Sequence, residues 1–228
     1  MRRRTKRDRL RWLTARPFAH RGLHDLGAGR PENTLAAFDA AVKAGYGIEC
    51  DVHVSSDGVP IVFHDDRLER LTGEQGCVRD LTADELADIH IAGTSECVPT
   101  LDEVLSLVEG RVPLLIELKH IKRRDAGLAW GVAERLKRYA GPAAAMSFRG
   151  SLIRELKAAD PHLVRGLTAA GDWRAGPQHL REKEMGRFGT GKCRDTSQRA
   201  QPESCRIERI SPSQHHVGHV RMLARAIE

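Results

Sequence analysis

The stretch GIECDVHV, residues 47–54, is the longest strand that the sequence predicts. It carries two acidic side chains among apolar ones. Side chains alternate between the two faces of a strand, so Glu49 and Asp51 project to one face, whereas Ile48 and Cys50 project to the other. The two carboxylates therefore share one space, and the apolar face is free to pack against helices.

Around this strand, short apolar runs alternate with helical patterns from residue 17 onward, which is typical of an α/β fold. Further strands are expected at 17–20, 60–64, 112–118, 143–148 and 162–168, which makes six. Helices are expected near 34–44, 82–89, 101–109, 126–140 and 151–159. Two capping boxes support helix starts, and they pair Thr82 with Glu85 and Thr100 with Glu103.

The strand 112–118 repeats the pattern of 47–54. Glu117 and Lys119 are two positions apart and share the inward face, together with Leu115. The outward residues, expected to pack against helices, are Leu114, Ile116 and Leu118. Because the active site of a parallel α/β barrel lies at the C-terminal ends of its strands, both acidic strands are expected to supply the same site.

Three inward carboxylates, those of Glu49, Asp51 and Glu117, need a counter-ion. Like charges a few ångströms apart would force one group to protonate unless a cation neutralises them. An all-oxygen ligand set favours one hard divalent cation, Mg²⁺ or Ca²⁺. The alternative is that these acids form ion pairs with arginine and hold no metal.

The sequence Ser-Asp-Gly at 56–58 is a turn signal between the strands 47–54 and 60–64. If these strands form a hairpin, the expected register pairs Asp51 with His64 and places this histidine beside the acids. A purely parallel barrel would instead need a longer connection at this point.

His20 and His64 each end a short apolar strand, and imidazole is the side chain whose ordinary pKa lies nearest neutrality. They are the expected general acid and base. Arg21 offers a planar set of donors suited to a phosphate oxygen, and Lys119 offers a second positive charge.

At these residues the sequence resembles the glycerophosphodiester phosphodiesterase family, from about residue 17 to about residue 168. The hallmark elements of the family stand here as HRG (20–22), PENT (31–34), IECDV (48–52), DG (57–58), VFHD (62–65) and IELK (116–119). By this resemblance Glu32, the motif glutamate, is expected near the site, in contact with the metal or with the glycerol of the substrate.

The resemblance implies a TIM (β/α)8 barrel and a divalent cation held by Glu49, Asp51 and Glu117. It also implies acid/base roles for His20 and His64. The implied reaction is the hydrolysis of a small-molecule glycerophosphodiester to glycerol 3-phosphate and an alcohol. A related barrel enzyme acting on whole phospholipids is a further alternative.

Three regions are expected: a basic N-terminal tail at 1–16, a partial barrel at 17–180, and an atypical, disordered basic tail at 181–228. Six strands leave the barrel open, because a TIM barrel has eight and typically about 250 residues. We expect the sequence to leave the family pattern near residue 181, as a truncated or frameshifted gene would. The alternative function is therefore a remnant that binds phosphodiesters without turnover.

The net charge is +6, but the basic residues concentrate at the two ends, so residues 17–180 are net acidic and nucleic-acid binding is not expected. No apolar run approaches the roughly 18 residues of a membrane helix, and no signal-peptide core follows the basic start. The tail 1–16 is expected to be solvated; weak attraction to an anionic membrane surface is the alternative.

Five scattered cysteines suggest reduced thiols, which favours a cytoplasmic location. No sequence signal sets an oligomeric state.

Overall fold

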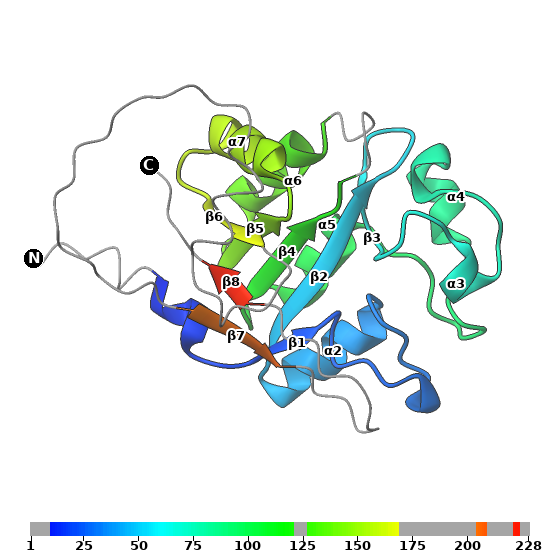
Figure 1. Ribbon diagram of the computed structural model, residues 1–228. Coiled ribbons are helices and arrows are strands. Elements are labelled where there is room, and N and C mark those ends of the chain that lie inside the picture. Colours follow the sequence, from blue (N-terminus) through cyan, green and yellow to red (C-terminus); the bar gives the residue numbers. More distant parts are fainter. Residues whose placement is uncertain (1–9, 121–126, 169–203, 209–220, 224–228) are drawn as a thin grey trace, which may run out of the picture.

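The protein, seen here in a computed structural model, is described over residues 10–120 and 127–168, and in its backbone over 204–208 and 221–223. One eight-stranded sheet runs through it, with helices around the sheet (Figure 1). The strands are β1 (Phe18–His20), β2 (Gly47–Val54), β3 (Pro60–Val62), β4 (Leu114–Leu118), β5 (Ala143–Ser147), β6 (Val164–Thr168), β7 (Ser204–Glu208) and β8 (Arg221–Leu223). The α-helices are α2 (Leu35–Ala44), α3 (Glu69–Thr72), α4 (Ala83–Ala87), α5 (Leu101–Val108), α6 (Leu128–Arg138) and α7 (Gly150–Ala159). Short 3-10 helices are η1 (Arg11–Thr14), η2 (Leu26–Ala28) and η3 (Val78–Asp80).

The sheet closes on itself. Its strand order is β1-β7-β8-β6-β5-β4-β2-β3, and β1 also pairs with β2, so every strand except β3 lies in a ring. Neighbours from β1 through β2, β4 and β5 to β6 are parallel, as the α/β barrel expected from the sequence requires. β7 is parallel to β1, whereas β8 is antiparallel to β6 and to β7. This reversed strand departs from an all-parallel TIM barrel.

The six strands and five helices expected from the sequence are all present, and no end differs from the expected one by more than two residues. Both capping boxes are formed: the hydroxyls of Thr82 and Thr100 each accept from the backbone N–H three residues later, and the glutamates at those positions return the bond. These reciprocal bonds fix where α4 and α5 begin.

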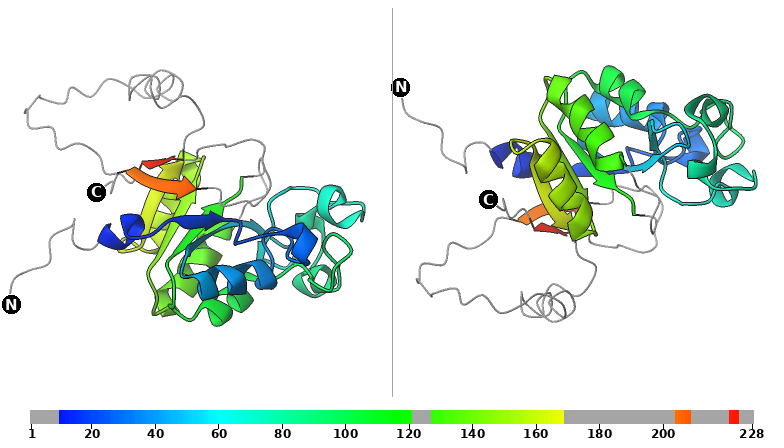
Figure 2. Two further views of the ribbon diagram at one scale, coloured as in Figure 1. Left: turned by 90° about the horizontal axis from the view of Figure 1, so that it is seen from below. Right: turned by 90° about the horizontal axis from the view of Figure 1, so that it is seen from above.

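The core has two main layers that follow the alternation of the strands. Outside the ring, the apolar faces of β2 and β4 pack against helices, and Ile48, Cys50 and Ile116 are fully buried there. Inside the ring, Leu115 and Phe18 meet in a smaller cluster. Figure 2 shows α5 and α6 on the side of the sheet away from β7 and β8. The outward packing predicted for β2 and β4 is therefore confirmed.

A third cluster forms a small lobe between β3 and α5, which we call the β3–α5 lobe and define as residues 61–98. Its buried members include Ile61, Phe63, Leu68 and Val78. The lobe contains α3 and α4 and lies at one end of the molecule (Figure 1). The apolar cluster of the lobe therefore fixes the position of the loop after β3.

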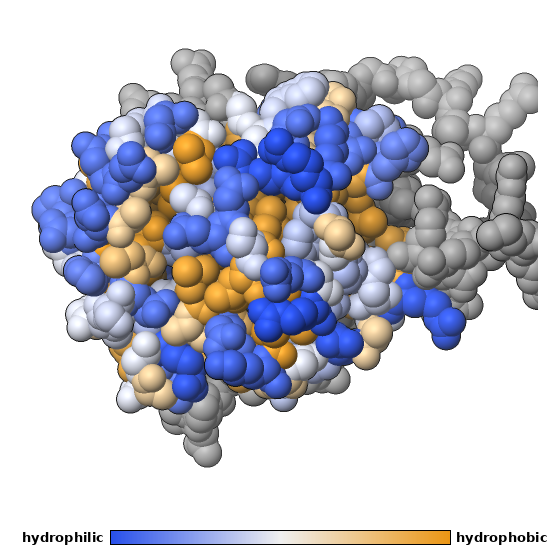
Figure 3. Space-filling model, turned by 180° about the vertical axis from the view of Figure 1, so that it is seen from behind, coloured by the Kyte–Doolittle hydropathy of each residue, from blue (hydrophilic) through white to orange (hydrophobic). Residues whose placement is uncertain are grey.

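The surface seen from behind is mostly hydrophilic, with apolar side chains in recesses between polar ones (Figure 3). The exposed large hydrophobic side chains among the described residues are Leu26, Trp130 and Phe148. No described helix has both the length and the apolar character needed to cross a membrane.

The expectation of a C-terminal segment without strands is wrong at two places. Ser204–Glu208 and Arg221–Leu223 form β7 and β8, which join β1 to β6 and close the gap that six strands would leave. Composition averaged over 181–228 conceals such short strands, whose backbone groups find partners only in the finished sheet. The rest of the tail expected there lies outside the described residues.

The expectation of a solvated tail over residues 1–16 is also wrong in part. Residues 11–14 form η1, and Leu13 is buried against Phe18 and Leu115 inside the ring. The charge of this segment predicted solvation, but its two leucines, Leu10 and Leu13, and its tryptophan supply enough apolar surface for docking. Residues 1–9 lie outside the described residues.

The hairpin of β2 and β3 is present, but its register is shifted by one residue from the expected one. Val52 pairs with Val62 and His53 with Ile61, so His64 does not pair with Asp51. The turn causes the shift, because Ser55 N donates to Val59 O at 3.0 Å and fixes those residues opposite each other. β3 also ends at Val62, two residues before the expected end.

Candidate active site

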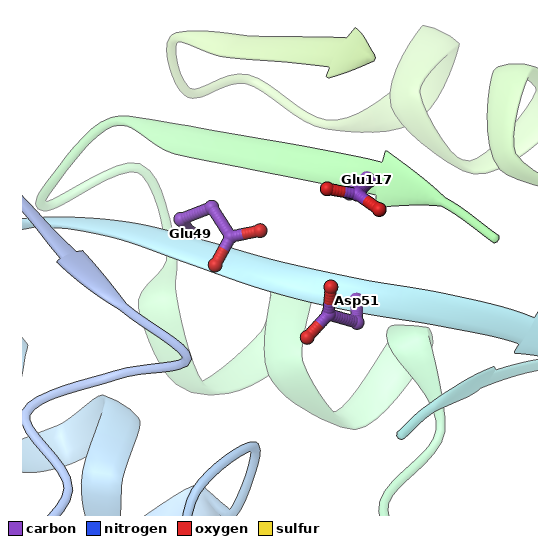
Figure 4. Close-up of side chains that lie close together, drawn as sticks. All are labelled: Glu49, Asp51 and Glu117. Atoms are coloured by element: carbon purple, nitrogen blue, oxygen red, sulfur yellow. The ribbon is translucent and has the colours of Figure 1, made fainter. Parts of the chain in front are cut away.

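The carboxylates of Glu49, Asp51 and Glu117 converge at one place inside the ring (Figure 4). One oxygen of each lies within 4.8 Å of the others, and the three side chains are buried. The parallel register of β2 and β4 brings them together, since it pairs Asp51 directly with Glu117. The predicted proximity of acids from two separate strands is therefore confirmed. Their role as metal ligands stays a prediction.

The electrostatics of the three acids are unequal. Burial, together with the charges of Asp51 and Glu117, raises the pKa of Glu49 well above its ordinary value. Burial also raises the pKa of Glu117, although the charge of Lys119 opposes it. Burial alone would raise the pKa of Asp51, but the charges of Lys119, His64 and Arg21 hold it below its ordinary value. The site thus lacks enough positive charge for three carboxylates.

Two cations lie against these acids. Lys119 Nζ is 2.7 Å from Asp51 Oδ1 and 2.6 Å from Glu117 Oε1, and Arg21 Nε is 3.3 Å from Asp51 Oδ2. The alternative prediction was that these acids form ion pairs with arginine and hold no metal. It is met in part, because Arg21 pairs with Asp51. Two cations against three buried carboxylates leave an excess of negative charge, and an all-oxygen set of this kind suits a hard divalent cation. The donor set thus fits Mg²⁺ or Ca²⁺.

The turn after β1 places a backbone donor against Glu49. Arg21 and Gly22 both have positive φ, 58° and 80°, so the chain leaves β1 abruptly. Arg21 N donates to Glu49 Oε2 at 3.0 Å. A side chain at Gly22 would lie 2.9 Å from the Cβ of Ala37, so glycine is required both for its conformation and for its size. This geometry explains the HRG sequence.

The two histidines approach each other along one edge of β2. The other edge is taken by β4, so β1 and β3 share this edge: β1 ends with His20 opposite Glu49, and β3 approaches from the far end. Phe63 N still donates to Asp51 O, which leads the chain to His64 near the acids. His20 Nε2 lies 3.9 Å from Glu49 Oε2, and the His64 charge influences the pKa of Asp51. Both predicted histidines are therefore at the site despite the shifted register.

Asn33 is a site residue that sequence reasoning missed. It is fully buried, its Nδ2 donates to Asp51 Oδ2 at 3.0 Å, and its Oδ1 accepts from Asp51 N at 3.3 Å. Its φ is 56°, a conformation that asparagine tolerates better than most residues. The signal was present as the asparagine of PENT, directly before Thr34, the N-cap of α2.

Replacing Asn33 by alanine is expected to destabilise the protein by roughly 2–4 kcal/mol, because the bonds to a buried carboxylate are lost and alanine is strained at this φ. Asn33→Gly is the matched variant, since it loses the same amide without the strain. It should cost about 1 kcal/mol less than alanine. Urea unfolding measures both, and a variant Asn33→Ala as stable as the parent would contradict the assignment.

Glu32 lies at the site rim between two arginines. Its Oε1 accepts from Arg21 Nη1 at 2.8 Å and from Arg70 Nη2 at 2.7 Å. Burial alone would raise the pKa of Glu32, but the hydrogen bond from Arg70 and the charges of both arginines lower it below its ordinary value. Glu32 is therefore an ionised acceptor held by two arginines, and one of them, Arg21, also contacts Asp51.

Around His64, the structure adds residues that the sequence interpretation left unassigned. Asp65 Oδ1 lies 2.5 Å from His64 Nδ1, and Asp65 Oδ2 accepts from Arg70 Nε. Buried His53 contacts the same segment, with its Nε2 3.1 Å from His64 O. Burial lowers the pKa of His64, which the charge of Asp51 partly offsets.

Comparison with known proteins gives a consistent result. The family model described as "Glycerophosphoryl diester phosphodiesterase family" matches residues 20–192, which extends past residue 181, where a departure was expected. A glycerophosphodiester phosphodiesterase of Bacillus altitudinis is 37% identical over 131 residues, 54% of this chain and 52% of that protein. One from Caldanaerobacter subterraneus is 34% identical over 148 residues, 60% of each.

Among solved structures, the fold is similar to that of an Oleispira antarctica phosphodiesterase in complex with the product sn-glycerol-3-phosphate. The TM-score is 0.62 and the identity 30%, over 72% of this chain and 71% of that chain. The chain spans about half the length of the first curated relatives it matches, from 44% to 52%.

Proposed function

The chain belongs to the glycerophosphoryl diester phosphodiesterase family, and from this premise we propose that it hydrolyses glycerophosphodiesters to glycerol 3-phosphate and an alcohol, with one divalent cation. The observation that carries the proposal is the convergence of Glu49, Asp51 and Glu117 within 4.8 Å, buried and short of positive charge. The glycerol 3-phosphate complex of the Oleispira protein supports the substrate class.

In this proposal the three carboxylates hold Mg²⁺ or Ca²⁺, which when bound supplies charge stabilisation for the phosphoryl oxygens. Arg21 and Lys119 then bind the non-bridging oxygens of the phosphate, for which their charges and position beside Asp51 suit them. Glu32, held by its two arginines, accepts from the hydroxyls of the glycerol moiety.

Phosphodiester hydrolysis needs one proton removed from the attacking hydroxyl group and one delivered to the leaving alkoxide. His20 and His64 perform these two transfers. They approach the acids from opposite directions along one edge of β2, so a phosphate held at the acids lies between them. Because Asp65 accepts from His64 Nδ1, the other ring nitrogen of His64 is the one that exchanges a proton with the substrate.

The test is release of glycerol 3-phosphate from glycerophosphocholine by the full chain, with and without a chelator. The proposal expects turnover that chelation removes and added Mg²⁺ or Ca²⁺ restores. Turnover that survives thorough chelation would refute the metal requirement. Release from lysophospholipid vesicles, with none from glycerophosphocholine, would favour the related enzyme that acts on whole phospholipids.

A second candidate, a binding remnant without turnover, is favoured by the reversed strand β8 and by the short span of the match to curated relatives. Binding of glycerophosphocholine by calorimetry with no product release would select it.

For the cellular location we propose the cytoplasm, because the cysteines at 50, 77 and 97 are free thiols.

A further inference from the structure

The side chain of Arg70 joins two parts of the site that are far apart in the sequence. Its Nε donates to Asp65 Oδ2, and its Nη2 donates to Glu32 Oε1 at 2.7 Å. Asp65 contacts His64, whereas Glu32 contacts Arg21. A single guanidinium thus links the segment that carries His64 to the segment that carries the HRG turn.

The backbone that carries Arg70 is anchored independently of these ion pairs. Leu68, two residues earlier, is fully buried in the β3–α5 lobe beside Phe63 and Val78. Leu68 N donates to Gly76 O at 3.1 Å, and Thr72 Oγ1 donates to Leu68 O at 2.9 Å. The lobe therefore holds the start of α3 in place, and Arg70 reaches from it toward the site.

The direction of the proton between Asp65 and His64 follows from chemistry. Burial alone would raise the pKa of Asp65, but hydrogen bonds from Arg70 and His64 lower it, so its carboxylate is ionised and can only accept. The proton lies on His64 Nδ1, which leaves Nε2 without one in the neutral ring. The carboxylate of Asp65 can rotate about its side-chain bonds. A donor other than His64 is therefore needed to hold Asp65 Oδ1 at the imidazole, and Arg70 Nε is that donor.

We propose that Arg70 is a positioning residue: by fixing Asp65 against Glu32, it holds the imidazole of His64 in the tautomer and orientation that the reaction needs. This inference rests on the proposed function for its kinetic consequence, but its structural consequence stands without it. It also gives the β3–α5 lobe a role, since the lobe is what places Arg70.

The kinetic test is a double-mutant cycle in the full chain with Arg70→Ala and Asp65→Asn. Each single change is expected to lower kcat about 10- to 100-fold, the loss typical for partners that orient a reacting histidine. The double variant should be no slower than Asp65→Asn, because Arg70 acts through Asp65. Losses that multiply in the double variant, or an Arg70→Ala enzyme within twofold of the parent, would overturn the proposal.

Arg67 provides the matched control, because it lies just before α3, three residues from Arg70, and pairs with Glu69 but, within the described residues, contacts none of the site residues above. Arg67→Ala should retain kcat within twofold. Arg70 is 48% exposed, so its ion pairs contribute little stability, and the melting temperature of Arg70→Ala should fall by no more than about 4 °C. If that variant fails to fold, Arg70→Lys replaces it in the cycle, since a single ammonium group cannot reproduce the paired contacts of the guanidinium with Asp65 and Glu32.

The second readout is the ¹⁵N spectrum of the His64 imidazole, which reports the tautomer whether or not the protein turns over. The parent and Arg67→Ala should show the Nδ1-protonated ring, whereas Arg70→Ala should show a mixture of tautomers. An unchanged tautomer in Arg70→Ala would overturn the proposal. A parent without turnover but with the expected spectra would refute the proposed function and leave the positioning role supported.

Discussion

Replacing His64 by alanine is expected to lower kcat for glycerophosphocholine by about 10²- to 10⁴-fold, the range that general acid–base catalysis contributes. His20→Ala should cause a loss of the same order. His20 is the last residue of β1 and His64 lies two residues after β3, and neither belongs to an apolar cluster, so the far-ultraviolet circular dichroism should not change. Glycerol 3-phosphate release measures turnover, and the dichroism spectrum measures folding.

The control for these variants is His162→Ala. His162 is exposed on the loop before β6, away from the strand ends that carry the acids, and its replacement should leave kcat unchanged. A double variant of His20 and His64 that still turned over at a tenth of the parental rate would end the acid/base assignment.

Much of the site could be predicted because it depends on alternation within strands. Glu49 and Asp51 share a face in any straight strand, and Glu117 follows the same rule in β4, so their inward direction needed no knowledge of the rest of the fold. The parallel register that sets Asp51 opposite Glu117 then completes the cluster. Local rules thus suffice where a strand is long and its pattern regular.

The features that were missed depend on how one turn closes or on contacts between distant segments. The hairpin register was wrong by one residue because the bonds between Ser55 and Val59 set it, and several turn closures were compatible with the same Asp-Gly signal. β7 and β8 find their partners only in β1 and β6, which lie far away in the sequence. Arg70 was missed for the same reason, since nothing local reveals that it reaches Glu32.

The second large effect concerns the acid cluster. Glu49→Gln is expected to abolish turnover and to remove the rise in melting temperature that Mg²⁺ or Ca²⁺ causes in the parent. A cation at 100 times its Kd stabilises the folded form by about 2.7 kcal/mol, which for a chain of this size is a shift of roughly 5–10 °C. The shift should vanish because a neutral amide replaces one of the three charged ligands. Thermal melts with and without each metal measure it.

Without metal, the same variant should be at least as stable as the parent. Burial and the repulsion from Asp51 and Glu117 already oppose the charged form of Glu49, and glutamine retains an oxygen that can accept from Arg21 N. Glu134→Gln is the matched control, because Glu134 is exposed and pairs only with Lys137 in the described part of the chain, so its variant should keep the full metal-induced shift. A parent whose melting temperature ignores both metals, or a Glu49→Gln protein that responds like the parent, would show that the three carboxylates do not form a cation site.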